Sequence, residues 1–230
     1  MSFSPYYVRM HNFITRPIQD EAELRQIEQM ESPEYQAVTP NIDQMIGRWQ
    51  TNPDAFLGLF QEEDGGQRLI GHIRIHPIAA EVLDRFRGGL AGYEEIWPLP
   101  LAQVQRDGCS LWYIGSMVID KAFRKPTQNN PIGLLLAHAL NAWSESGTLR
   151  YPISIYTTGL KPESRAMLRR FGFQLEVEGA LLVNQAPLFA LHAASKNDLF
   201  APFLRRGLTT RWGGLGGSYL IVGSHSTSTN

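Results

Sequence analysis

Residues 117–133 combine three features that together restrict the fold more than any other segment of the chain. Residues 117–119 end an apolar, β-branched run, Arg124 and Lys125 make the following loop cationic, and a strongly amphipathic stretch begins at Pro131. The N-terminus of a helix carries unpaired N–H groups and a partial positive charge, which stabilise a phosphate placed there. The segment therefore predicts a strand, a phosphate-binding loop and a helix in direct succession.

The composition predicts a globular protein with no nucleic-acid-binding face. The 230 residues are 43% hydrophobic and 19% charged, which suffices for one substantial core, and the net charge of −1 offers no basic surface for nucleic acid. No secretory signal is indicated, and the longest apolar stretch is shorter than the roughly 20 residues that a bilayer requires. Cys109 is the only cysteine, so no intramolecular disulfide can form. We therefore expect a cytoplasmic protein that does not bind membranes.

The apolar periodicity predicts a mixed α/β fold in which strands and helices alternate irregularly. Helices are expected at 20–30, from Thr39 (as N-cap) and Pro40 onward, and at 79–87, 131–145 and 162–171. Strands are expected at 13–18, 55–61, 68–76, 110–119, 152–157, 173–177 and 188–192. The second to fourth strands should pair antiparallel, while a helix connects the fourth to the fifth, so the class is an α/β sheet covered by helices.

The composition also divides the chain into a main domain and a tail. Residues 1–194 form the predicted domain, with an insertion at 77–108 that contains an aromatic and proline-rich stretch. Residues 195–230 form a Gly/Ser/Thr-rich extension, which we expect to be mobile unless it docks on a partner. A homodimer that uses this extension as its contact is one such arrangement.

Two histidines, His72 and His76, are four residues apart, a spacing at which both could bind one metal ion. His72 and His76 lie in a segment that alternates like a strand, so both side chains share one face. No carboxylate stands at a metal-motif spacing from them, and the single cysteine cannot form a cysteine-rich zinc site. We therefore expect no metal.

The element order and the cationic loop resemble the GNAT (GCN5-related N-acetyltransferase) superfamily over residues 13–192. In that family the fourth strand leads into a loop of pattern Arg/Gln-x-x-Gly-x-Gly/Ala, and here Gln128 to Gly133 matches at the first and last positions, with Pro131 at the fourth. The resemblance implies a largely antiparallel sheet with splayed fourth and fifth strands, and acetyl-CoA or another acyl-CoA as co-substrate. It implies that the cofactor contacts come from the strand end, the loop and the helix start, namely Met117, Val118, Ile119, Arg124, Lys125, Gln128, Asn129, Asn130, Ile132 and Gly133.

A second segment, residues 161–173, is similar to the family's helix that ends in Gly-Phe after the fifth strand. The resemblance implies a tyrosine there that protonates the leaving thiolate, but this chain has Leu168 at that position and Lys161 where an asparagine is usual. The proton donor is therefore expected elsewhere in the chain.

The remaining candidates follow from the chemistry of amine acylation, which needs a proton acceptor and a proton donor. Tyr113 on the fourth strand is suited to donating a proton, because an ordinary tyrosine pKa is near 10. His72 has the ordinary pKa of a base, and Tyr156, with Thr157 beside it, would border the splay. From the insertion, substrate contacts are predicted at Glu94, Glu95 and Trp97.

Three functions are carried forward from this reading. The first is direct transfer of an acyl group from coenzyme A to a small-molecule amine, without a covalent enzyme intermediate and without use of Cys109 as nucleophile. The second is implied by a resemblance of the fourth strand and of residues 167–173 to a branch of the superfamily that makes long-chain N-acyl amino acids or acyl-homoserine lactones from an acyl-carrier donor. The third is a non-catalytic acyl-CoA-binding module, consistent with Pro131 and Leu168.

Overall fold

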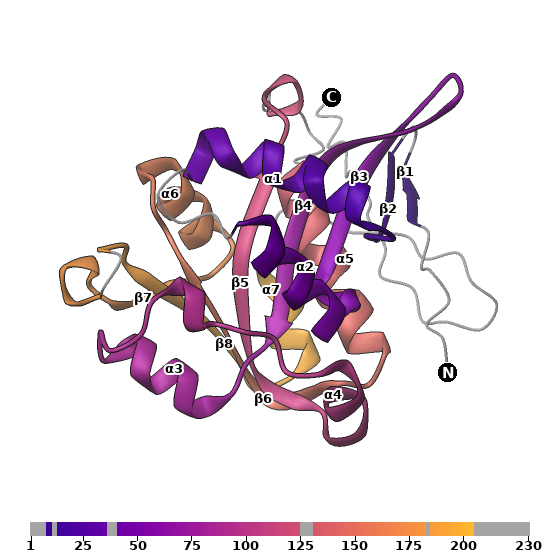
Figure 1. The fold of residues 1–230 in the computed structure, drawn as a ribbon. Coiled ribbons are helices and arrows are strands. Elements are labelled where there is room, and N and C mark those ends of the chain that lie inside the picture. Colours follow the sequence, from indigo (N-terminus) through magenta and orange to yellow (C-terminus); the bar gives the residue numbers. More distant parts are fainter. Residues whose placement is uncertain (1–7, 11–12, 36–40, 125–130, 183–184, 205–230) are drawn as a thin grey trace, which may run out of the picture.

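The computed structural model describes residues 8–10, 13–35, 41–124, 131–182 and 185–204, which build one mixed sheet with helices on both faces (Figure 1). Within these residues the sheet has eight strands in the order β1-β2-β3-β4-β5-β6-β8-β7. The strands are β1 (Val8–Met10), β2 (Phe13–Pro17), β3 (Phe56–Glu63), β4 (Gly66–Pro77), β5 (Cys109–Ile119), β6 (Leu149–Thr158), β7 (Gln174–Val177) and β8 (Leu188–Ala193). All neighbouring strands pair antiparallel except β5 and β6, which confirms the predicted α/β class.

The helices cover the two faces of the sheet in separate groups. Helices α1 and α2 lie on one face, in front in Figure 1, and α5 and α7 lie on the other. The helices of the described chain are α1 (Glu21–Tyr35), α2 (Ile42–Thr51), α3 (Ala80–Arg87), α4 (Leu101–Asp107), α5 (Pro131–Glu145), α6 (Pro162–Arg170) and α7 (Lys196–Leu204). Short 3-10 turns are η1 (Pro53–Ala55), η2 (Tyr93–Glu95), η3 (Lys121–Phe123) and η4 (Gly179–Leu181).

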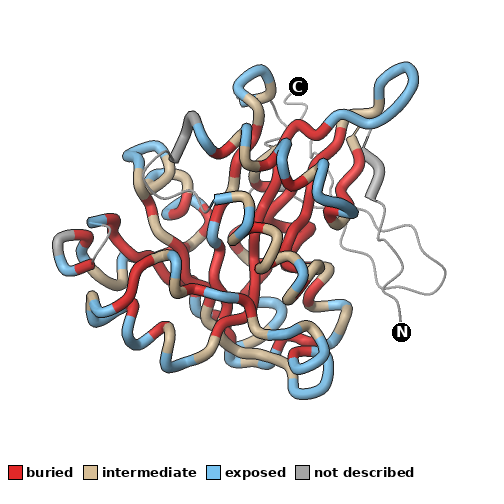
Figure 2. Tube along the Cα trace, in the orientation of Figure 1, coloured by how far each residue is buried: buried red, intermediate tan, exposed pale blue. Residues whose placement is uncertain are grey.

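The main core lies between the sheet and α5. Figure 2 shows β4 buried over most of its length, while the tip of the β3–β4 hairpin is exposed. Because strand side chains alternate between faces, Ile73 and Ile75 of β4 pack in the cluster that contains Leu135, Leu136 and the other apolar residues of α5. The intervening residues of β4 consequently project toward α1 and α2.

Two further apolar clusters form on the α1/α2 face. One packs Leu24 and Met45 of α1 and α2 against β3 and β4, and the other packs Leu83 and Phe86 of α3 against β5, β6 and β8. Residues 77–108, predicted as an insertion, therefore fold over the sheet. Their helix α3 matches the predicted helix, whereas α4 was not predicted.

Helix boundaries agree with the predictions where the capping signals are strong. Helix α5 spans Pro131–Glu145 as predicted, with Pro at its first position. The predicted start of the second helix was wrong: Asn41 is the N-cap, because its Oδ1 accepts a hydrogen bond of 2.9 Å from the N–H of Gln44. Thr39 and Pro40 lie outside the described residues.

The packed domain extends beyond the predicted boundary at residue 194. Helix α7 follows β8 directly and buries Phe200 and Phe203 in the main core. The rings of Phe171 and Phe203 stack with their centroids 5.3 Å apart, which joins α7 to the end of α6. The rest of the predicted extension, residues 205–230, lies outside the described residues.

None of the helices in the described part of the chain combines the length and the apolar character that crossing a membrane demands.

Candidate functional site

Strands β5 and β6 separate in the middle of the sheet. Their last paired residues are Ile114 and Thr157, and the hydroxyl of Thr157 donates a hydrogen bond of 3.0 Å to the carbonyl of Ile114 at this point. Beyond it, β5 continues to Ile119 and pairs only with β4. The splay expected between these two strands is therefore present, and it leaves one side of β5 without a strand partner.

A β-bulge coincides with the start of the splay. Arg74 pairs with Ser116 and Ile75 pairs with Ile114, so Gly115 is an extra residue in β5. A bulge shifts the alternation of side chains by one residue. Tyr113 before it and Ser116 after it consequently both lie on the α1/α2 face, beside Arg74.

A cleft of about 810 Å³, part of it open to solvent, lies at this splay. Its walls come from α1, α2, β4, η2, β5, the end of β6 and α6. The lining residues are Glu31, Arg48, Arg74, His76, Tyr93, Ile96, Tyr113, Ile114, Gly115, Ser116, Met117, Thr157, Thr158, Leu160, Ser164, Met167 and Leu168. The cleft thus combines an apolar wall from α6 with a strongly polar wall from the α1/α2 face.

The polar wall is built around a buried ion pair. Nη2 of Arg74 lies 3.2 and 3.3 Å from the two carboxylate oxygens of Glu31, and Nε donates a hydrogen bond of 3.0 Å to the hydroxyl of Ser116. Glu31 is 1% exposed and Arg74 is 5% exposed, so both charges are removed from water. Isolated charges would not be stable at this depth, and the pair fixes the end of α1 against β4 and β5.

His72 contacts the carboxylate of this pair inside the protein and does not line the cleft. It is fully buried, with Nε2 3.3 Å from Glu31 Oε1. Burial, only partly offset by the carboxylate, lowers the pKa of His72 to about 4, so its imidazole is neutral at pH 7. His72, proposed for catalysis from the sequence, therefore does not reach the cleft.

Arg48 projects from α2 into the same wall and is 5% exposed. Its Nη2 donates to the backbone carbonyls of Tyr93 and Glu94 at 3.0 and 3.3 Å, and its guanidinium lies over the ring of Trp97 at 5.4 Å. Its Nε is buried without a hydrogen-bond partner. Burial, followed by repulsion from Arg74, lowers the pKa of Arg48 to about 10, which still leaves it charged at neutral pH.

Two tyrosines, Tyr93 and Tyr113, line the polar side of the cleft. The hydroxyl of Tyr93 donates a hydrogen bond of 2.7 Å to the hydroxyl of Thr158, whereas the hydroxyl of Tyr113 is buried without a hydrogen bond. Burial, with a smaller contribution from Tyr93, raises the pKa of Tyr113 far above its ordinary value. Tyr113 therefore keeps its proton at neutral pH and can donate a hydrogen bond to a developing anion, but it cannot act as a base.

His76 completes the polar wall beside Tyr113. The two rings lie 5.9 Å apart, and Nε2 of His76 is buried without a partner. Burial and the guanidinium groups of Arg48 and Arg74 hold the pKa of His76 well below its ordinary value. The ring therefore stays neutral and can accept a hydrogen bond.

Some of the predicted cofactor residues lie within the described residues, and the others lie outside them. Met117 lines the cleft, Val118 and Ile119 continue the unpaired edge of β5, and Arg124 is exposed just beyond η3 with its Nε bonded to the carbonyl of Ile119 at 2.6 Å. Ile132 and Gly133 lie in the first turn of α5. Lys125, Gln128, Asn129 and Asn130 lie outside the described residues.

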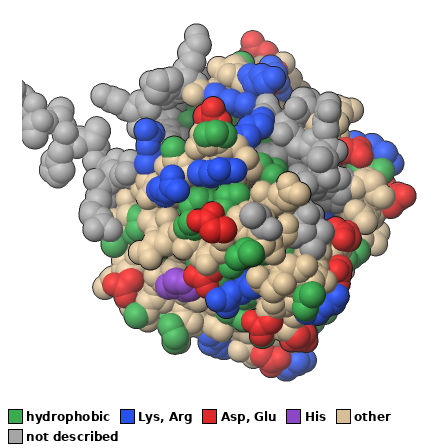
Figure 3. Space-filling model, turned by 90° about the vertical axis from the view of Figure 1, so that its left-hand side faces the viewer, with side chains coloured by type: hydrophobic (Ala, Val, Ile, Leu, Met, Phe, Trp, Pro, Cys, Tyr) green, Lys and Arg blue, Asp and Glu red, His purple; other side chains and the backbone are tan. Residues whose placement is uncertain are grey.

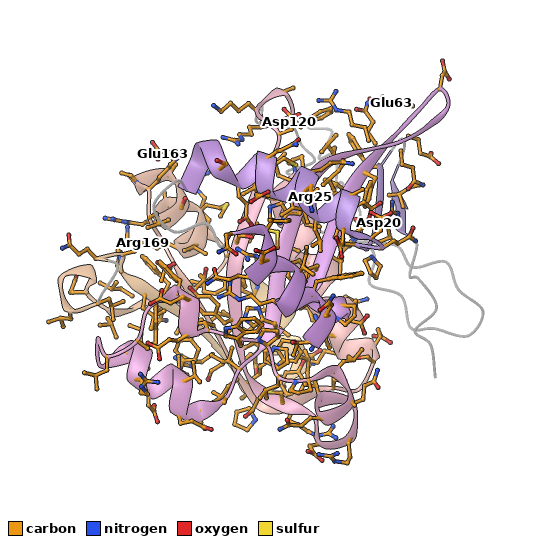
Figure 4. The ribbon with its side chains drawn as sticks, viewed as in Figure 1. Asp20, Arg25, Glu63, Asp120, Glu163 and Arg169 are labelled. Atoms are coloured by element: carbon orange, nitrogen blue, oxygen red, sulfur yellow. The ribbon has the colours of Figure 1, made fainter. Side chains whose placement is uncertain are left out.

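The end of β5 is fixed by a polar turn. The carboxylate of Asp120, labelled in Figure 4, accepts a hydrogen bond of 2.9 Å from the N–H of Ala122 and pairs with Arg68 at 2.9 Å. On the face that lies at the left of Figure 1, Figure 3 shows several basic side chains gathered together. Lys161, which precedes α6, and Arg169 and Arg170 at the end of α6 are exposed basic residues.

The other predicted site residues lie around the cleft without lining it. Glu94 and Trp97 are exposed, and Glu95 forms an ion pair of 2.7 Å with Arg85, so the insertion reaches the cleft through Tyr93 and Ile96 instead. Tyr156 packs in the cluster beneath α3, where its ring contacts His192.

Three charged residues of the polar wall were missed in the sequence. Glu31 lies just past the predicted end of the first helix, Arg48 lies within the second, and Arg74 stands between the two histidines of β4. The alternation His72, Arg74, His76 was the one available signal, because three basic residues on one face of an otherwise apolar strand require buried partners.

No protein-family model matches the sequence, and no curated protein matches it at a significant level. Solved structures do match. They include a chain of the NatC complex bound to Gag peptide and CoA (TM-score 0.55, 12% identity, covering 80% of this chain and 99% of that one). They also include NAA60 from Arabidopsis thaliana in complex with acetyl-CoA (0.51, 16%, 80% and 99%) and the GNAT-like decarboxylase GphF in complex with isobutyryl-CoA (0.52, 16%, 79% and 99%). At these identities the likeness shows that the chain has the GNAT fold.

Proposed function

We propose that this protein is an acyl-CoA-dependent N-acyltransferase that moves an acyl group directly from coenzyme A to a small amine. The observation that carries the proposal is the coincidence of the β5 bulge, the β5–β6 splay and a polar cleft at one point of a GNAT fold. Three structural neighbours are described as bound to CoA, acetyl-CoA or isobutyryl-CoA, which supports a CoA thioester as donor.

The edge of β5 that β6 leaves beyond Thr157 is the proposed donor site. No strand pairs with this edge among the described residues, so the amide-containing arm of coenzyme A can approach it as a short strand would. At the far end of this edge, Arg124 and the first turn of α5 would attract the phosphates. The thioester carbon would then lie within the cleft.

The proposed reaction needs two proton transfers. The amine nitrogen attacks the thioester carbon, the carbon–sulfur bond breaks, one proton leaves the nitrogen and one reaches the sulfur. Burial and two guanidinium groups disfavour protonation of His76, so its neutral imidazole would orient the amine by accepting a hydrogen bond, and a water in the cleft would take the first proton. The hydroxyl of Tyr113 would donate a hydrogen bond to the departing sulfur, in place of the residue replaced by Leu168, and a water would supply the proton that the sulfur gains.

The test is a direct assay of the purified full chain. Acetyl-CoA, isobutyryl-CoA and palmitoyl-CoA are each incubated with a panel of amines, free thiol is measured, and acylated products are identified by mass spectrometry. Thermal denaturation with each thioester reports binding separately, since a ligand at 100 times its dissociation constant adds about 2.7 kcal/mol of stability.

The outcomes separate the three functions. Amine-dependent thiol release with a matching product supports the proposal, and Arg124→Ala should weaken donor binding severalfold whereas Arg106→Ala, an exposed arginine on α4, should not. Thermal stabilisation without thiol release with any amine would favour a non-catalytic binder. Activity confined to palmitoyl groups delivered by an acyl-carrier protein would favour the long-chain synthase.

A further inference from the structure

The polar wall of the cleft carries more buried positive charge than the fold neutralises. Arg48 and Arg74 both line the cleft and are each 5% exposed. Arg74 is neutralised by Glu31. Within the part of the chain that the structure describes, no carboxylate forms an ion pair with Arg48, whose hydrogen-bond partners are the two backbone carbonyls of η2. The wall therefore has one buried positive charge in excess.

Unpaired polar atoms gather around this excess charge. Nε of Arg48, Nε2 of His76 and the hydroxyl of Tyr113 are all buried without hydrogen-bond partners, and all three residues line the cleft. Buried polar groups in a folded protein normally have partners, so a group of unpaired ones along one wall indicates a polar ligand. A ligand that carries one negative charge would complete both the charge balance and the hydrogen bonds.

We propose that the acceptor amine also bears a carboxylate, as a free amino acid does, and that Arg48 binds this carboxylate with Arg74 as the second cation. This assignment rests on the acyltransferase function proposed above. A planar guanidinium matches the two oxygens of a carboxylate better than any other side chain does. Arg48 is a binding residue in this assignment, and Glu31 holds Arg74 in place.

The position of the arginines assigns the carboxylate to the acceptor rather than to the acyl group. Arg48 comes from α2, and Arg74 meets Glu31 of α1, so both lie on the α1/α2 face. Helix α5, whose first turn would hold the donor phosphates, packs on the opposite face. The donor and the second substrate then reach the thioester from opposite sides of the sheet.

The experiment compares acceptors that differ only in this charge. Glycine, leucine, phenylalanine and glutamate are assayed as free acids and as α-amides with the best donor of the first assay. We expect the free acids to be preferred in kcat/KM. In Arg48→Gln the ratio of acid to amide should fall by about 10- to 100-fold, which corresponds to one lost charge-assisted hydrogen bond. Arg48→Lys, which keeps the charge, should retain part of the preference, and Arg106→Gln, an exposed arginine on α4, should leave it unchanged.

A folding defect in the Arg48 variants would be visible in circular dichroism and thermal denaturation. In that case Trp97→Ala, which removes the aromatic ring beside the guanidinium without removing the charge, serves as the second variant. It should raise the KM for the acids more than the KM for the amides.

The following results decide the inference. Equal use of acids and amides by the wild type, or an unchanged ratio in a folded Arg48→Gln, would overturn it while the acyltransferase function stands. The donors are compared in the same way. If the wild type prefers succinyl-CoA or malonyl-CoA to acetyl-CoA and Arg48→Gln loses that preference, the acceptor assignment is overturned and the carboxylate belongs to the acyl group. If no thiol release occurs at all, calorimetric titration of the free acids in the presence of CoA decides. Binding that is lost for the amides and in Arg48→Gln supports the carboxylate site, and absence of binding overturns it.

Discussion

Replacing His138 with glutamine should make the fold less sensitive to mild acid. His138 lies on α5, 4% exposed, with Nδ1 3.1 Å from the hydroxyl of Thr15 on β2 and with Nε2 buried without a partner. Burial lowers the pKa of His138 to about 4. Glutamine can still bond to Thr15 but has no proton to gain in this range, and the site is separate from the cleft.

The sign and size of the effect follow from the two pKa values. The unfolded imidazole has a pKa of about 6.5, so between pH 6.5 and 4 the unfolded chain binds a proton that the folded chain does not bind. The free energy of unfolding therefore falls as the pH falls through this window, and the loss levels off below about pH 4. Between pH 7.5 and pH 5.0, this single group costs about 2 kcal/mol.

The assay is urea unfolding of the wild type and of His138→Gln at pH 7.5 and pH 5.0. Carboxylates and the other histidines contribute equally to both proteins, so the difference isolates His138. We expect the wild type to lose about 2 kcal/mol more than the variant over this interval. An identical pH dependence in wild type and His138→Gln would refute the reasoning, because it would mean that His138 is not held neutral in the fold.

Three further predictions concern the site and the insertion. Glu31→Gln should lower the free energy of unfolding in urea by about 3 kcal/mol, because it leaves its arginine partner buried and unpaired; Glu163→Gln, an exposed residue on α6 (Figure 4), should change it little. Tyr113→Phe should leave thermal stability unchanged or higher, because the hydroxyl has no partner, yet lower kcat on the order of 100-fold if its hydrogen bond stabilises the departing sulfur. Gly89→Ala should lower the melting temperature by an amount equivalent to about 1–3 kcal/mol, because φ is 69° and the added Cβ would meet the carbonyl of Leu181.

The regular elements could be predicted because their signals are local. Helix α5 has a proline at its first position and an apolar stripe, and Gly147, with φ of 71°, follows its end. Helix α4 was missed because its seven residues carry too short a pattern. Helix α7 was assigned to the tail because Gly/Ser/Thr-rich sequence follows it, although tertiary packing of its phenylalanines outweighs that signal.

The site could be predicted only in part, because its charges meet through contacts distant in sequence. Tyr113 was identified from its place on the strand before the splay, and it does line the cleft. Glu31 and Arg74 are 43 residues apart, and neither belongs to a local motif. The bulge at Gly115 was equally hidden, because it is defined by the register against β4 and leaves no local sequence signature.

The polar wall is better explained by ligand binding than by stability. A buried ion pair seldom stabilises a fold more than apolar residues of similar volume would, and an unneutralised buried cation such as Arg48 opposes folding. Two apolar clusters lie on either side of this wall and could have been joined by apolar side chains. The chain instead places a second guanidinium and two unpaired polar groups at the point where the bulge opens β5. Because folding alone gives no reason for this arrangement, the free energy it costs is most simply recovered when an anionic substrate enters the cleft.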